Sequence, residues 1–253
     1  MIVDLEDAVA PERKVSAREG LVASFAALPD ADRQRLLVRI NAGGTPWHDD
    51  DCKAVAALVA QGLIAGVVLP KAERADDLRR LAEAVGPKGL LVPLIESAAG
   101  LAAVDELAAA PQVLRLAFGN LDFQADVGLA CDADEAELVP VRLALLLATR
   151  RAGLPAPIDG VTADWRDARR LATDTARARR GGFGAKLCIH PDQVAAVHTT
   201  LGPSADELAW ARRVVDAIRS AGGGVVSLDG RMVDAPVVRL AERLLALDAQ
   251  PPP

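Results

Sequence analysis

The sequence contains few cysteines and no pattern that suggests a disulfide framework. Cys52, Cys131 and Cys188 are the only 3 in 253 residues. They lie far apart and match neither a CxxC motif nor the Cys/His spacing of a zinc site. We therefore expect buried or incidental thiols in a reducing compartment.

The sequence also lacks the segments that direct a chain to a membrane. No apolar run reaches about 18 residues without a charge, and the N-terminus has no charged segment followed by an apolar signal core. The formal net charge is −6, with basic residues scattered along the chain. This balance argues against a nucleic-acid or membrane-surface partner. We expect a cytoplasmic protein that acts on a small molecule.

No Pro/Gly/Ser-rich linker separates two domains, and no internal repeat is present. Instead, short β-rich runs alternate with longer Ala/Leu/Arg-rich segments of helical period. The expected strands are residues 2–5, 36–40, 66–70, 90–95, 114–119, 157–159 and 185–189. The expected helices are residues 13–27, 49–60, 74–85, 99–109, 136–152, 164–180 and 191–200, with a helical tail at 204–220 and 235–247.

This alternation predicts parallel strands joined by crossover helices. Because the chain has no GxGxxG phosphate loop, we favour an α/β fold of the (β/α) barrel type over a doubly wound sheet. We expect a barrel over residues 1–220 and a C-terminal lid or tail of the same domain over residues 221–253.

Polar side chains follow every expected strand, where a barrel places its chemistry. Each charge there is costly unless a partner or a metal compensates it. These residues are Asp4, Glu6, Asp7, Arg39, Asn41, Lys71, Glu96, Asp122, Asp159 and His190.

Glu96 and Asp122 follow successive strands and can reach one hard cation between them. Mg²⁺ fits this pair best and Mn²⁺ is the alternative, whereas Zn²⁺ is disfavoured because no His or Cys stands close by. In the competing interpretation, Glu96 caps a helix that begins near Ser97, and Asp122 starts the next turn.

Seven blocks of the sequence carry a family resemblance: DLEDAVAPERK, VRINAGGTPW, VVLPKAE, LIESAAG, FGNLDFQADVG, AKLCIHPDQV and GRMVDAPVV. In content and order they resemble the HpcH/HpaI aldolase and citrate lyase β-subunit (CitE-like) family. The resemblance implies a TIM-type (β/α)8 barrel that uses Mg²⁺ to break or form a carbon–carbon bond. The implied substrate is a β-hydroxyacyl-CoA such as citryl-CoA, citramalyl-CoA or malyl-CoA, and the products are an acyl-CoA and an α-keto acid.

The same resemblance implies roles for individual residues. Glu96 and Asp122 match the metal ligands, and Arg39 matches the arginine of the RIN motif. Arg39 suits the negative charge that builds on the thioester oxygen, although an ion pair with Glu6 or Asp7 is the alternative.

Further residues receive expected roles with open alternatives. Glu6 and Asp7 either hold Arg39 and metal-bound waters or are solvated acids at a helix N-terminus. Lys71 either binds a phosphate or carboxylate of the CoA substrate or pairs with a neighbouring acid. For His190 we favour a structural or CoA-proximal role over that of a general base.

The tail block supplies the last candidate. In the family, a C-terminal segment can close over a neighbouring subunit's site, and Asp234 matches its acid/base. The alternative is that Asp234 caps the helix beginning near Pro236. By resemblance we expect a homo-oligomer, a trimer or a hexamer.

One family feature is absent from the sequence. CitE-like chains begin with a strand of the LFVPG type and its helix, whereas here Met1 directly precedes the DLED block. We therefore expect a barrel without its first βα unit, whose seven strands leave two unpaired edges. A metal-dependent aldolase of CoA-free hydroxy-keto acids and a catalytically silent ligand-binding paralogue remain alternative functions.

Overall fold

The computed structural model describes residues 1–222 and 224–248. The chain forms two compact units. The first comprises Met1–Ala163 and Arg177–Ile189, and the second comprises Asp164–Ala176 together with the described residues from His190 onward. The lid boundary near residue 220 stays a prediction, because packing alone does not test a lid.

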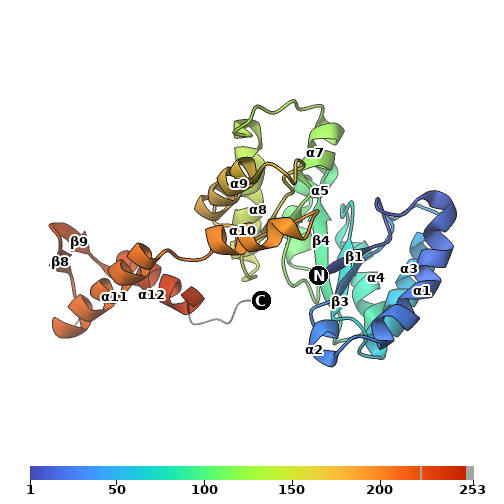
Figure 1. The fold of residues 1–253 in the computed structure, drawn as a ribbon, viewed down its shortest axis with the longest axis horizontal. Coiled ribbons are helices and arrows are strands. Elements are labelled where there is room, and N and C mark those ends of the chain that lie inside the picture. Colours follow the sequence, from blue (N-terminus) through green and yellow to red (C-terminus); the bar gives the residue numbers. More distant parts are fainter. Residues whose placement is uncertain (223, 249–253) are drawn as a thin grey trace. The chain divides into compact units, whose positions relative to one another are not determined.

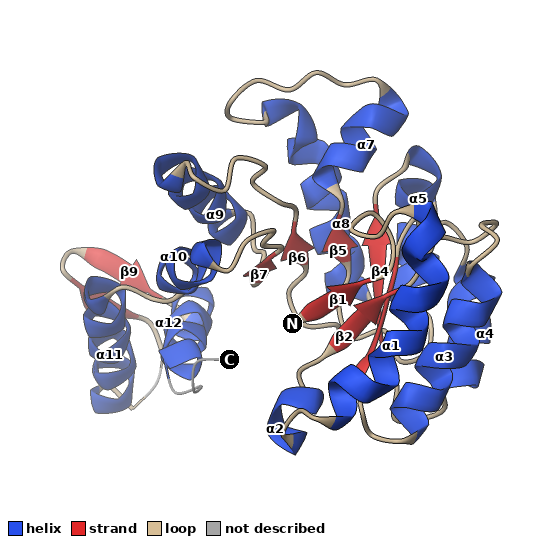
Figure 2. Cartoon of the chain, turned by 45° about the vertical axis from the view of Figure 1, so that its right-hand side comes forward, coloured by secondary structure: helices blue, strands red, loops and turns tan. Residues whose placement is uncertain are grey.

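The first unit is built on a curled sheet of seven parallel strands, visible in Figure 2. Its strands are β1 (Ile2–Asp4), β2 (Leu37–Arg39), β3 (Gly66–Leu69), β4 (Leu90–Ile95), β5 (Ala117–Phe118), β6 (Ile158–Asp159) and β7 (Ala185–Lys186). They pair in chain order, and within the described residues β1 and β7 form the two edges. The prediction of seven strands in an incomplete TIM-type barrel is confirmed.

Strand register brings the polar strand ends together. Asp4 lies opposite Arg39 in the β1–β2 pair, and Ile95 lies opposite Phe118 in the β4–β5 pair. Residues that follow these positions therefore emerge at one edge of the sheet.

Helices cover the outer face of this sheet (Figure 1). Those of the first unit are α1 (Lys14–Ala26), α2 (Asp30–Arg33), α3 (His48–Ala60), α4 (Ala75–Val85), α5 (Ala98–Ala102), α6 (Val104–Ala108), α7 (Asn120–Val127) and α8 (Val139–Arg151), with short 3-10 turns at Pro11–Arg13 and Ala136–Leu138. Helix α9 (Ala168–Arg180) contains the boundary between the two units. No helix in residues 1–222 and 224–248 is long and apolar enough to cross a membrane.

Both faces of the sheet are buried, as parallel sheets require. Val67 and Leu69 of β3 point toward the helices and join the main core. Val68, between them, packs with Val92 and Leu94 in a second apolar cluster on the other face. This alternation anchors each strand from both sides and fixes where its polar end emerges.

The second unit has a small core of its own. It contains α10 (Asp192–Leu201), α11 (Ala205–Ser220), the antiparallel hairpin of β8 (Val226–Leu228) and β9 (Arg231–Val233), and α12 (Ala235–Asp248). The buried residues of this core are Ala211, Val214, Val233, Ala241 and Leu244.

Candidate metal and substrate site

The candidate site lies at the carboxyl ends of β1 to β5 in the first unit. Glu6 follows β1, Arg39 ends β2, Lys71 follows β3, Glu96 follows β4, and Asp122 lies in the first turn of α7 after β5. The structure brings these residues together from five consecutive strand ends, because the strands are parallel and in register.

Arg39 is surrounded by carboxylates. Its Nε and Nη2 donate to Asp4 Oδ1 and Oδ2 at 2.8 and 2.6 Å, a bidentate pair. Its Nη1 lies 2.9 Å from Glu6 Oε2 and 3.2 Å from Asp7 Oδ2. The ion-pair alternative for Arg39 is therefore present, and Asp4 is its strongest partner, which the sequence did not indicate.

Lys71 connects two of the acids through different atoms. Its backbone N–H donates to Glu96 Oε1 at 2.7 Å, and its Nζ donates to Glu6 Oε1 at 3.2 Å. Its φ of 47° lies in the left-handed region, which non-glycine residues seldom occupy. This backbone geometry aims the N–H at Glu96, while the side chain, 48% exposed, pairs with a neighbouring acid.

Glu96 is a buried carboxyl group, only 3% exposed. Burial, together with the charges of Asp122 and Glu6, raises its pKa to about 8, against the opposing effect of the Lys71 N–H. Burial also raises the pKa of Glu6, against the opposing effect of the Arg39 guanidinium. Such a cluster of carboxylates favours a cation, which would displace the proton from Glu96.

The backbone opposite Glu96 leaves space for its carboxylate. A Cβ atom added to Gly119 would lie 2.3 Å from Glu96 Oε2, closer than real contacts allow. The glycine before α7 thus permits the close approach of β5 to Glu96.

The donor set fits a hard cation. Among the described residues, no group of three or more His, Cys, Asp or Glu side chains is placed to hold a metal by itself. Mg²⁺ commonly binds through one or two carboxylates and completes its octahedron with water or substrate oxygens. Glu96 and Asp122 suit that mode.

The helix-cap alternative is correct in part. Ser97, and not Glu96, caps α5 through its side chain, which accepts from the Gly100 N–H at 3.1 Å. Asp122 does lie in the first turn of a helix. That position does not remove it from the site, because its charge acts on Glu96.

A buried hydrogen-bond network, which the sequence did not predict, connects the loops that follow β1 and β2. Lys14 Nζ donates to the carbonyls of Leu5 and Glu6 and, at 2.6 Å, to Asn41 Oδ1. Asn41 Nδ2 in turn donates to Asp51 Oδ2 at 2.6 Å. The lysine of the DLEDAVAPERK block was the available signal.

Asp159 does not join the carboxylates of the site. It is fully buried and accepts from Arg142 Nε of α8 at 2.8 Å. Asp159, at the end of β6, therefore attaches α8 to the sheet through Arg142.

His190 and Asp234 belong to the second unit. The His190 ring stacks on Trp165 with centroids 3.9 Å apart, and its Nδ1 lies 3.5 Å from Asp192 Oδ2. Asp234 Oδ1 accepts from the Val237 N–H at 3.3 Å, so the helix-cap interaction of the alternative interpretation is present.

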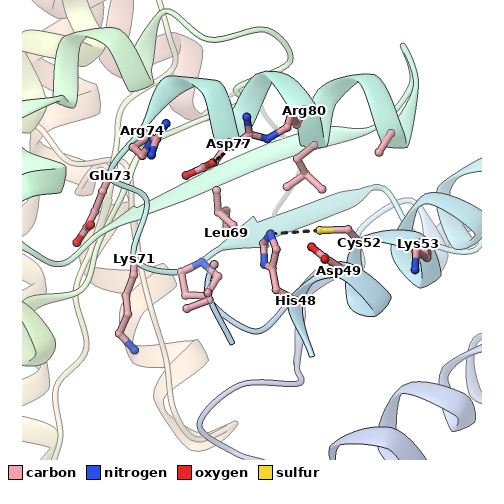
Figure 3. A pocket seen from close by; sticks show the side chains of 16 residues that line it. His48, Asp49, Cys52, Lys53, Leu69, Lys71, Glu73, Arg74, Asp77 and Arg80 are labelled. Carbon is pink, nitrogen blue, oxygen red and sulfur yellow. Dashed lines mark hydrogen bonds and ion pairs between the residues drawn. The ribbon is translucent and has the colours of Figure 1, made fainter. Parts of the chain in front are cut away.

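A cavity of about 770 Å³ lies between α3 and α4 and extends to Lys71 (Figure 3). His48, Cys52 and Lys53 line it from α3, and Asp77 and Arg80 from α4. Nothing in the spacing of these residues predicted that they share a cavity.

Comparison with known proteins shows which family this chain belongs to. Residues 1–191 match the model of the HpcH/HpaI aldolase/citrate lyase family. A citrate lyase subunit beta-like protein of Mycobacterium tuberculosis is 37% identical over 97% of this chain and 86% of its own length. A (3S)-malyl-CoA thioesterase of Cereibacter sphaeroides is 32% identical over 97% of this chain and 85% of its own length.

Solved structures give the same relationship. CitE from M. tuberculosis, in complex with magnesium, acetoacetate and coenzyme A, superposes with a TM-score of 0.84 and 36% identity over 98% of this chain and 89% of its own. Both its sequence and its fold thus place this chain in the HpcH/HpaI aldolase/citrate lyase family.

Proposed function

We propose that this protein is a Mg²⁺-dependent carbon–carbon lyase. Its substrate is a β-hydroxyacyl-CoA such as citryl-CoA, citramalyl-CoA or malyl-CoA, and its products are an acyl-CoA and an α-keto acid. The observation that carries the proposal is the buried Glu96 carboxylate, held by the Lys71 N–H beside Asp122 and the Arg39 cluster. The magnesium and coenzyme A of the M. tuberculosis CitE complex support it.

Glu96 and Asp122 would hold the metal, Mg²⁺ or alternatively Mn²⁺. When bound, the ion supplies Lewis-acid chemistry toward the oxygens of the fragment that leaves as the keto acid. The Lys71 N–H fixes Oε1 of Glu96, which orients the carboxylate before substrate arrives.

Arg39 opposes the negative charge that builds on the thioester oxygen as the bond breaks. Asp4 holds its guanidinium in a fixed plane through two hydrogen bonds. Its weakest contact is with Asp7, which is 63% exposed and free to turn into solvent. An exchange of Asp7 for a substrate oxygen at Nη1 would retain the contacts with Asp4 and Glu6.

Lys71 and His190 are assigned to the CoA portion of the substrate. The Lys71 ammonium is half exposed beside the cavity between α3 and α4. Asp234 of a partner copy would return a proton to the carbon that carries the enolate charge. This role of Asp234 requires a homo-oligomer, which we propose to be a trimer or a hexamer. We also propose that the protein is cytoplasmic.

The test is an assay with each CoA thioester and each matching free acid, with and without Mg²⁺. We expect keto acid and acyl-CoA to form in equal amounts from a thioester, only with the metal. Keto acid from the free acids would favour an aldolase, and free CoA without keto acid would favour a thioesterase. Folded protein that binds ligand without turnover would favour a silent paralogue.

A further inference from the structure

The cavity between α3 and α4 contains a pair of side chains that the proposed reaction does not use. We propose that His48 and Cys52 form a binding site for a thiophilic divalent cation of the Zn²⁺ class, separate from the Mg²⁺ site. The two residues stand one turn apart on α3, so both side chains lie on the same face of the helix.

The imidazole is already oriented as a ligand. His48 Nδ1 lies 2.8 Å from the backbone carbonyl oxygen of Asn41. A carbonyl only accepts hydrogen bonds, so Nδ1 carries the proton and the lone pair is on Nε2. Metal-binding histidines commonly have their second nitrogen held in this way.

The separation of the two ligand atoms fits a tetrahedral metal. Cys52 Sγ lies 3.6 Å from His48 Nε2. Bonds of about 2.3 Å to sulfur and about 2.1 Å to nitrogen, at a tetrahedral angle, place these two atoms about 3.6 Å apart. A cation could therefore replace the thiol proton with little movement of α3.

The surroundings favour a cation over a free thiolate. Burial, together with the charges of Asp49 and Asp51, raises the pKa of the Cys52 thiol to about 11. Two basic groups that line the cavity have acidic partners: Lys53 donates to Asp50 at 3.1 Å, and Arg80 pairs with Asp77. A bound cation would displace the thiol proton, and the same acidic charges would then stabilise the ion.

Both proposed ligands line the cavity. Figure 3 shows the His48–Cys52 contact on α3, with Arg74, Asp77 and Arg80 on α4 beyond it. A volume of about 770 Å³ leaves room for the water ligands. Sulfur and imidazole select soft or borderline metals, whereas Mg²⁺ requires oxygen ligands, so the two sites discriminate by chemistry.

The probe is Co²⁺ added to the whole protein in the presence of excess Mg²⁺. We expect one equivalent of Co²⁺ to produce a sulfur-to-cobalt charge-transfer band, which Zn²⁺ then removes. Cys52→Ser should abolish the band, and His48→Gln should weaken Co²⁺ binding at least tenfold. Cys131→Ser and Cys188→Ser are matched controls and should leave both unchanged.

A second measurement needs no variant. Zn²⁺ should protect Cys52 from alkylation, as read by peptide mass spectrometry, and one proton should be released for each ion bound near neutral pH. The proposal is overturned if wild-type protein gives no thiolate band, if the band survives Cys52→Ser, or if Zn²⁺ leaves Cys52 labelling unchanged. In that case the 3.6 Å contact is an S–H···N hydrogen bond only.

Discussion

Gly119 leaves the space that the Glu96 carboxylate occupies. We expect Gly119→Ala to displace the Glu96 carboxylate, because the new Cβ would lie 2.3 Å from Oε2. Mg²⁺ affinity should fall about 10- to 100-fold, the range typical when the support of a ligand is lost. Calorimetric titration measures the change. Gly20→Ala in α1 is the control: its Cβ meets nothing within 4 Å, so Mg²⁺ binding should not change.

Arg39→Lys tests the planar guanidinium. Lysine keeps the charge but has a single nitrogen, so it cannot form the planar pair with both oxygens of Asp4 and present a separate nitrogen toward substrate. We expect kcat to fall about 100- to 1,000-fold with KM nearly unchanged. Steady-state kinetics on the active thioester separate the two constants, and a raised KM with wild-type kcat would instead identify Arg39 as a substrate anchor.

Asp4 links the site to acid stability. Burial alone would raise its pKa, but the Arg39 guanidinium and the N–H groups of Glu6 and Ala8 outweigh burial and lower the pKa below its ordinary value. The stabilisation is therefore present above about pH 4, the pKa of an unfolded Asp, and is lost as pH falls through the lower folded value.

Asp4→Asn should therefore destabilise the protein at pH 7 by about 1–3 kcal/mol. The difference from wild type should shrink near pH 3. Urea unfolding at both pH values measures it. A difference that stays constant with pH would mean that Asp4 contributes through packing rather than through its charge.

At the scale of elements, Lys14 attaches α1 to the loops that follow β1 and β2. Lys14→Met would leave Asn41 Oδ1 and the carbonyls of Leu5 and Glu6 without this buried donor. We expect a loss of about 3 kcal/mol in the free energy of unfolding. Lys53→Met is the control: that side chain is 77% exposed and should change stability by less than about 0.5 kcal/mol.

Elements with a strong periodic pattern were predictable from the sequence. All seven parallel strands and helices such as α4 follow the pattern, because burial on one or two faces sets the period of apolar residues. The segment 99–109 was expected as one helix, but it breaks at Ala103, whose φ and ψ are −92° and 6°, into α5 and α6. No residue type there signals a break.

The sequence analysis did not predict the hairpin of β8 and β9, although the Asp229–Gly230 dipeptide is typical of a tight turn between antiparallel strands. Both residues have the positive φ that such a turn requires, 53° and 73°. The strands have only three residues each, too few to produce a recognisable alternation.

At the scale of the whole molecule, the candidate site was predictable only as a set of strand ends. Spacing along the chain identified Glu6, Arg39, Lys71, Glu96 and Asp122, because parallel strands end at one edge. The order of partners depends on side-chain geometry that spacing does not encode, so Asp4 as the main partner of Arg39 was not foreseen. The contact of His48 with Cys52 was likewise overlooked, since neither residue belongs to a motif.

If each subunit contributes its Asp234 to the site of a neighbouring subunit, two inactive variants should complement each other. Glu96→Gln and Asp234→Asn should each be nearly inactive alone. When mixed under conditions that allow subunits to exchange, they should regain part of the lyase activity, because some sites then combine an intact Glu96 with an intact Asp234. A mixture as inactive as its components, with exchange verified by mass spectrometry, would place Asp234 outside the partner's site.

The order of the strands also bears on how the chain folds during synthesis. Each strand from β2 to β7 pairs with the strand made just before it. A nascent chain can therefore extend the sheet one βα unit at a time at its free edge, without waiting for a distant segment. Glu96 and Lys71 would meet as soon as β4 docks on β3, so every carboxylate of the site except Asp122 would be in place on the ribosome before α7 emerges.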